Sequence, residues 1–120
     1  MVRFHHVNLG VPVGEADAEG AFLVDYLEFR RVEAPSDIGS NAKWYEAEDG
    51  KQVHLSEDPE HRPAARAHVA VEVGDGLAAL EHKFDEAGYK YKAFDGTERR
   101  TLFCKDPAGN RWELRGTLPH

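Results

Sequence analysis

The sequence has a single cysteine, few basic residues and no long hydrophobic run, and each shortage argues against a class of protein. Cys104 cannot form a disulfide within the chain, which indicates a reducing compartment, so we expect a cytoplasmic location. The 15 Lys and Arg residues are outnumbered by 22 Asp and Glu residues, giving a net charge of −7 that disfavours a nucleic-acid or anionic-membrane partner. Because no apolar stretch has the length of a signal peptide or membrane span, we expect neither export nor membrane insertion.

Near the end of the chain, a turn is followed by an alternating strand pattern. Residues 106–110 (Asp-Pro-Ala-Gly-Asn) have the composition of a turn. The residues after the turn alternate between an apolar face, with Trp112 and Leu114, and a polar face, with Arg111, Glu113 and Arg115. Glu113 is therefore expected to point away from the core.

The same pattern occurs earlier in the chain, which indicates an internal duplication. Residues 49–55 (Asp-Gly-Lys-Gln-Val-His-Leu) repeat an acidic residue, a glycine, an apolar residue and a leucine in the same order. Aligning Gly50 with Gly109 places His54 at the position of Glu113. Upstream, the strand pattern around His6 matches the one around His68. Two matches in the same order predict a chain built from two similar halves.

Each half predicts the order strand, helix, strand, strand, strand. The first module, at about 1–57, has a helix pattern at 15–27, a loop at 35–40 and strand patterns at 4–11, 29–33, 42–48 and 51–56. The glutamates of its helix are expected on a solvated face. A proline-interrupted linker at about 58–66 leads to the second module, at about 67–118, with a helix pattern at 76–87 and strand patterns at 67–73, 89–94, 101–105 and 111–115.

At 120 residues the chain has the length of one domain, and halves of this size are expected to share a core. The predicted fold class is α+β. Two tandem βαβββ modules are expected to form a curved mixed sheet around a central cavity, as a single domain spanning 1–120.

Four side chains of metal-ligand type lie on the polar faces of the predicted strands: His6, His54, His68 and Glu113. If the sheet curls around these faces, the four side chains converge in the cavity, which Trp44, Tyr45 and Phe103 are candidates to line. Three imidazoles and one carboxylate suit a divalent Fe, Mn, Ni, Co or Zn ion better than Mg or Ca, which prefer oxygen ligands.

The alternative is that these histidines are ordinary solvated or hydrogen-bonded strand residues, which is the commoner role of a single histidine at such a position. The repeat shifts the balance toward a metal site, because the ligand-type residues recur at matching positions. We interpret Cys104 as a buried small residue and not as a nucleophile, since no nearby His or Asp in the sequence supports its activation.

These motifs resemble the vicinal oxygen chelate superfamily, which includes glyoxalase I, extradiol dioxygenases, methylmalonyl-CoA epimerase, fosfomycin-resistance transferases and bleomycin-resistance proteins. The residues that carry the resemblance span nearly the whole chain: His6-Val7, 50–55 (Gly-Lys-Gln-Val-His-Leu), 67–70 (Ala-His-Val-Ala) and 106–114 (Asp-Pro-Ala-Gly-Asn-Arg-Trp-Glu-Leu). The resemblance identifies the superfamily and leaves the activity within it open.

The resemblance implies a cup of paired βαβββ modules around a metal ion, with His6, His68 and Glu113 as ligands. His54 occupies the remaining position, which is a glutamate in glyoxalase I and a glutamine in the epimerase, and is therefore a candidate fourth ligand. Small members of the superfamily often form dimers, so we expect a homodimer.

Two functions stay open. The first is a metal-dependent lyase, isomerase or dioxygenase that chelates a small oxygen-rich substrate, with Glu72 or His54 as the base because both are predicted to face the cavity. The second is a metal-free protein that binds a drug or metabolite, as bleomycin-resistance proteins do, and the acidic charge favours a cationic ligand. The filled ligand positions favour the enzyme.

Overall fold

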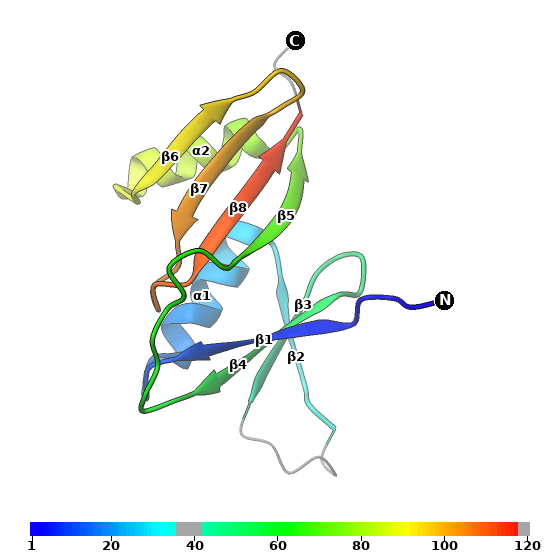
Figure 1. Cartoon of the computed structure of the whole chain (residues 1–120), viewed down its shortest axis with the longest axis vertical. Coiled ribbons are helices and arrows are strands. Elements are labelled where there is room, and N and C mark those ends of the chain that lie inside the picture. Colours follow the sequence, from blue (N-terminus) through cyan, green and yellow to red (C-terminus); the bar gives the residue numbers. More distant parts are fainter. Residues whose placement is uncertain (36–41, 118–120) are drawn as a thin grey trace. The chain divides into compact units, whose positions relative to one another are not determined.

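The computed structural model describes residues 1–35 and 42–117, and the chain divides into two compact units, Met1–Pro63 and Ala64–His120. Each unit contains one helix and one four-stranded sheet (Figure 1). Of the predicted loop at 35–40, all but Pro35 lies outside the described residues. Neither helix in the described part of the chain is long and apolar enough to cross a membrane.

The first unit is a βαβββ module. Its elements are β1 (His6–Val11), α1 (Ala16–Leu27), β2 (Arg30–Val32), β3 (Lys43–Glu46) and β4 (Gln52–Glu57). The strands lie in the order β1-β4-β3-β2, with β1 parallel to β4 and the other neighbours antiparallel. The parallel pair requires a connection that passes over the sheet, and α1 lies in that connection.

The second unit repeats this module. Its elements are β5 (His68–Gly74), α2 (Leu77–Ala87), β6 (Tyr91–Asp95), β7 (Arg100–Lys105) and β8 (Arg111–Gly116). The strands lie in the order β5-β8-β7-β6, again with one parallel pair, β5 and β8. The predicted fold class and the duplicated βαβββ order are confirmed, and each element lies within a residue or two of its predicted range.

In the first unit, α1 covers one face of the sheet through close contact with β3. A Cβ atom added to Gly20 of α1 would lie 1.9 Å from the hydroxyl oxygen of Tyr45, so only glycine allows this approach. Tyr45 is buried and faces the helix, which corrects the expectation that it lines the polar face of the sheet. Glu19 of α1 is fully buried, so the prediction that the helix glutamates lie on a solvated face is wrong for this residue.

In the second unit, the core lies between α2 and the apolar face of β8. Trp112 and Leu114 are fully buried, and so is Phe84 of α2, which follows from the alternation in β8 and the helical spacing in α2. The helix ends at Gly88, whose φ of 67° is the left-handed conformation that favours glycine at a C-cap. Cys104 of β7 is buried, as predicted, and burial together with the charge of Asp106 raises its pKa to about 12.

Candidate functional site

In each unit, the candidate ligands lie on the sheet face that points away from the helix. In the first unit, Trp44 pairs with His54 across β3 and β4, next to the pair that contains the helix-facing Tyr45. His6 pairs with Gln52 on the parallel neighbour, two residues from His54, so both histidines share one face. The strand alternation in the sequence therefore assigned His6 and His54 to the correct side.

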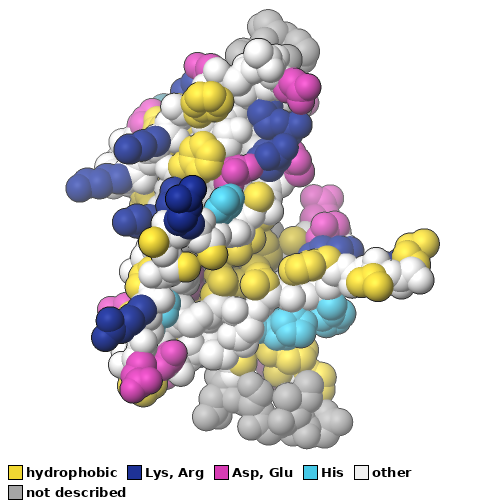
Figure 2. All heavy atoms as spheres, viewed as in Figure 1, with side chains coloured by type: hydrophobic (Ala, Val, Ile, Leu, Met, Phe, Trp, Pro, Cys, Tyr) yellow, Lys and Arg dark blue, Asp and Glu magenta, His cyan; other side chains and the backbone are white. Residues whose placement is uncertain are grey.

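A stack of three rings dominates this face of the first unit. The His54 ring lies between Trp44, at a centroid separation of 4.0 Å and an interplanar angle of 4°, and His6, at 4.0 Å and 16°. His54 is buried, whereas His6 is exposed, and Nδ1 of His6 lies 2.8 Å from Nδ1 of His5. Figure 2 shows histidine side chains gathered at the surface beside the N-terminal segment.

A chain of hydrogen bonds determines which nitrogen of His54 carries the proton. The amide of Gln52 donates to the carboxylate of Glu46 at 3.0 Å, which leaves the amide oxygen of Gln52 to accept from Nε2 of His54 at 2.8 Å. Burial, followed by repulsion from the positive charge of His6 and His5, lowers the pKa of His54 to about 4. At neutral pH His54 is therefore a neutral ring with its proton on Nε2.

In the second unit, His68 and Glu113 face each other across β5 and β8. Nδ1 of His68 donates to the backbone carbonyl of Arg66 at 2.9 Å, which leaves the lone pair on Nε2. This Nε2 lies 3.5 Å from Oε1 of Glu113, beyond the usual length of a hydrogen bond. Two donors that are each about 2.1 Å from a tetrahedral ion are about 3.4 Å apart, so the pair has the separation of two ligands on one cation.

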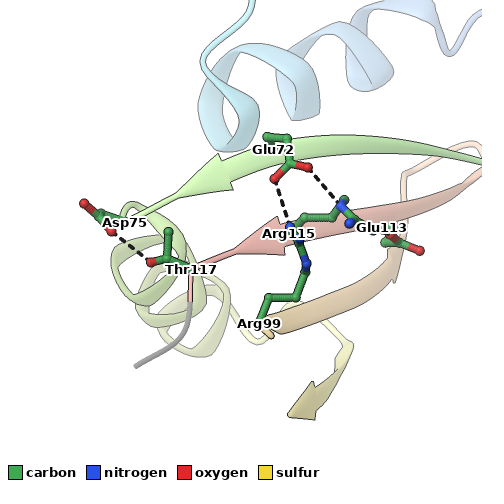
Figure 3. A network of polar contacts seen from close by, with 6 residues as sticks. All are labelled: Glu72, Asp75, Arg99, Glu113, Arg115 and Thr117. Carbon is green, nitrogen blue, oxygen red and sulfur yellow. Dashed lines mark hydrogen bonds and ion pairs between the residues drawn. The ribbon is translucent and has the colours of Figure 1, made fainter. Parts of the chain in front are cut away.

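The remaining polar residues on this face form an ion-pair network (Figure 3). Nη1 of Arg115 donates to Oε2 of Glu113 at 2.7 Å, and its Nε donates to Oε1 of Glu72 at 3.0 Å. Oε2 of Glu72 accepts from Arg99 at 3.4 Å. Both carboxylate oxygens of Glu72 are therefore paired with guanidinium groups.

The candidate ligands are thus found as two pairs, His6 with His54 and His68 with Glu113. Within residues 1–35 and 42–117, no group of three or more His, Cys, Asp and Glu side chains is arranged to hold a metal ion. Convergence of all four side chains on one ion stays a prediction.

The two pairs differ in how well they fit a metal. An imidazole binds a metal through a nitrogen lone pair that lies in the plane of the ring. The rings of His6 and His54 are stacked at an interplanar angle of 16°. Their lone pairs lie in two nearly parallel planes, so no single ion lies in both planes at the length of a metal–nitrogen bond. The two rings therefore do not fit the same ion in this arrangement. His68 and Glu113 do fit one ion, and His6 has Nε2 available for another ligand bond.

The alternation predicted the faces of these residues but not their contacts. Gln52 and Arg115, which lie two residues from His54 and Glu113 on the same faces, had no assigned role. Their spacing in the sequence is the signal that would have singled them out, because residues i and i+2 of a strand are neighbours on one face. Phe103 pairs with Glu113 across β7 and β8, so it lies on the polar face as expected.

Comparison with known proteins supports the fold across nearly the whole chain. A glyoxalase family protein from Bacillus anthracis is 20% identical, with a TM-score of 0.85 over 98% of this chain and 96% of that one. The fosfomycin resistance protein FosX from Listeria monocytogenes is 16% identical, with a TM-score of 0.80 over 97% and 93% of the two chains. A glyoxylase/bleomycin resistance protein/dioxygenase domain from Frankia sp. EAN1pec is 17% identical, with a TM-score of 0.77 over 98% and 93%.

The sequence matches no family model and no curated protein. The structural matches nevertheless show that the chain shares the fold of these glyoxalase, fosfomycin resistance and dioxygenase domain proteins. They confirm, at the level of fold, the resemblance that the motifs predicted.

Proposed function

We propose that this protein is a metal-dependent enzyme of the vicinal oxygen chelate type, with one divalent Fe, Mn, Ni, Co or Zn ion held by His6, His68 and Glu113. The observation that carries the proposal is the pair in the second unit, where Nε2 of His68 and Oε1 of Glu113 face each other at 3.5 Å. Two histidines and one carboxylate are a ligand set used for such ions, and they leave positions open for a substrate.

The bound ion would supply Lewis acidity toward two neighbouring substrate oxygens and toward the negative charge that develops on them. The chain's own residues prepare the site. The carbonyl of Arg66 fixes the tautomer of His68 with Nε2 free for the ion. Glu113, with a side chain only 15% exposed, keeps its carboxylate largely out of bulk water.

Under this proposal His54 supports His6 and is not a fourth ligand. Its Nε2 proton is donated to Gln52, and its ring stacks on the ring of His6. The stack limits the orientations of the exposed His6 ring, because a flat aromatic surface favours a parallel ring against it. A neutral ring with a pKa of about 4 is also a weak general base, so His54 is a poor candidate for proton abstraction.

The substrate class that fits is a small molecule with two adjacent oxygens, and the reaction class is that of a lyase, an isomerase or a dioxygenase. Of the two candidate bases, Glu72 remains the one to test. Assembly as a homodimer and a cytoplasmic location stay predictions.

The test is the metal content of protein purified without chelator or affinity metal, compared with a His6→Ala, Glu113→Ala double variant. We expect close to one transition metal ion per chain in the wild type and none in the variant. His82→Ala serves as the control, because His82 is an exposed residue of α2 that pairs only with Glu86 in its own helix.

The second candidate, a metal-free protein that binds a cationic drug or metabolite, is favoured by the net charge of −7. Absence of metal from the wild type, even after reconstitution with Fe, Mn, Ni and Zn, would contradict the enzyme and support this binding protein.

A further inference from the structure

Among the residues that the structure describes, the side chains that pair with Glu113 are Arg115 and His68. Arg115 lies two positions after Glu113 on the same face of β8, and its Nη1 donates to Oε2 of Glu113 at 2.7 Å. The other carboxylate oxygen, Oε1, is the one that faces Nε2 of His68. The two oxygens of Glu113 are thus distinguished, one held by a guanidinium and one directed toward the other candidate ligand.

Arg115 is itself held in place. Its Nε donates to Glu72 at 3.0 Å, and Arg99 approaches the second oxygen of that carboxylate at 3.4 Å (Figure 3). Hydrogen bonds to Glu113 and Glu72 raise the pKa of Arg115, so its charge is permanent. A planar guanidinium that bonds through two different nitrogens has little freedom to rotate, and it therefore fixes the direction of each carboxylate that it contacts.

The equivalent positions of the first unit carry no guanidinium. The register of the two sheets places Arg115 opposite Glu72, and the equivalent strands place Ser56 opposite Gly10. Ser56 accepts a hydrogen bond from Asn8 at 2.9 Å, and no charged group is involved. The guanidinium that contacts a candidate ligand directly therefore belongs to the second unit, whereas Arg30 of the first unit pairs with Glu46.

We infer that Arg115 is a positioning residue for the metal site: it holds Oε2 of Glu113 so that only Oε1 is presented to the ion. This inference rests on the proposed function. A hydrogen-bonded carboxylate ligand loses less freedom on binding, and removal of such an outer partner typically weakens metal binding about 10- to 100-fold.

The test compares Arg115→Met with Arg99→Met for affinity toward Co²⁺ or Mn²⁺, measured by competition with a chelator. Both variants remove one positive charge from the same network, but only Arg115 contacts Glu113. We expect Arg115→Met to weaken binding by about tenfold or more. Arg99→Met is expected to change it by less than about threefold, because the Arg99 side chain pairs with Glu72 and not with Glu113.

The direction of the change separates positioning from simple electrostatics. If Arg115 acted only through its charge, its removal would relieve repulsion of the cation and strengthen binding. Arg115→Lys keeps the charge but loses the planar guanidinium that donates to both carboxylates. We therefore expect its metal affinity to lie between those of the wild type and Arg115→Met. This second variant also carries the test if Arg115→Met does not fold.

The outcomes separate this inference from the proposed function. Wild-type protein that binds metal, with unchanged or tighter binding in Arg115→Met, or with equal losses in Arg115→Met and Arg99→Met, overturns the role of Arg115 alone. Wild-type protein that binds neither ion overturns the proposed function and the inference with it. Weaker binding in Arg115→Met and Arg115→Lys, with Arg99→Met close to the wild type, supports both.

Discussion

The two units share one scaffold but differ in what lies on the sheet face away from the helix. In the first unit this face carries a stack of rings, Trp44, His54 and His6, with the central ring neutral. In the second unit it carries the charged network of Glu113, Arg115 and their partners. In both units the apolar residues of the last strand are buried, Val53 and Leu55 in the first and Trp112 and Leu114 in the second, while the opposite faces carry different polar residues.

The turns before the last strand of each unit show the same divergence. Gly50 and Gly109 occupy matching positions with φ values of 86° and 85°, so the backbone path requires glycine in both. The acidic residue of the second turn, Asp106, is buried and accepts from the indole of Trp112 at 2.9 Å and from two backbone N–H groups. The matching position in the first turn is Ala47, and the acidic residue of that turn, Asp49, is exposed and accepts from one backbone N–H, that of Lys51.

We expect the largest loss of stability from removing the buried carboxylate of Asp106. Asp106→Ala leaves the indole N–H of Trp112 and two backbone N–H groups without this acceptor, and buried unpaired donors are costly. We expect the free energy of unfolding to fall by about 3 kcal/mol, measured by urea denaturation.

Asp49→Ala is the control in the turn of the other unit. Only one exposed hydrogen bond is lost, so the expected decrease is about 0.5 to 1 kcal/mol. Equal decreases for the two variants would show that the buried hydrogen bonds of Asp106 do not distinguish the two turns.

We expect a smaller effect from protonation of His54 in the ring stack, which makes the free energy of unfolding depend on pH. His54 has a pKa of about 4 in the folded protein, below the ordinary value of 6.5, so the unfolded chain binds this proton first as the pH falls. The stability that depends on neutral His54 is complete above pH 6.5 and is lost as the pH falls toward 4. Between pH 7 and 4.5 this amounts to about 2 kcal/mol.

His54→Phe keeps an aromatic ring in the stack but cannot bind the proton. Urea denaturation at pH 7 and pH 4.5 should therefore show a smaller decrease in stability for the variant than for the wild type, by that same amount. A parallel decrease in both proteins would mean that His54 is not held neutral by its burial in the stack.

The sequence alone was sufficient for the fold, because the alternation in strands and the spacing in helices report directly on burial. The same alternation assigned His6, His54, His68 and Glu113 to the polar faces. The alternation did not predict the side-chain contacts. It gives the side of the sheet on which a residue lies, but not which rings stack or which oxygen faces which nitrogen. Glu19 and Tyr45 were misassigned because a single helix position or strand residue depends on close packing that a periodic pattern does not resolve.

We propose that His6 joins His68 and Glu113 as ligands of one metal ion and that His54 is not a ligand. The most direct measurement is titration with Co²⁺, followed by the visible absorption of the bound ion, in the wild type and in His6→Ala, His68→Ala and His54→Phe. We expect one Co²⁺ per chain in the wild type and in His54→Phe, and loss of the spectrum in the two alanine variants. An unchanged spectrum in His6→Ala would show that His6 is not a ligand, and loss of the spectrum in His54→Phe would show that His54 is needed for the site. Either result would contradict the proposed ligand set.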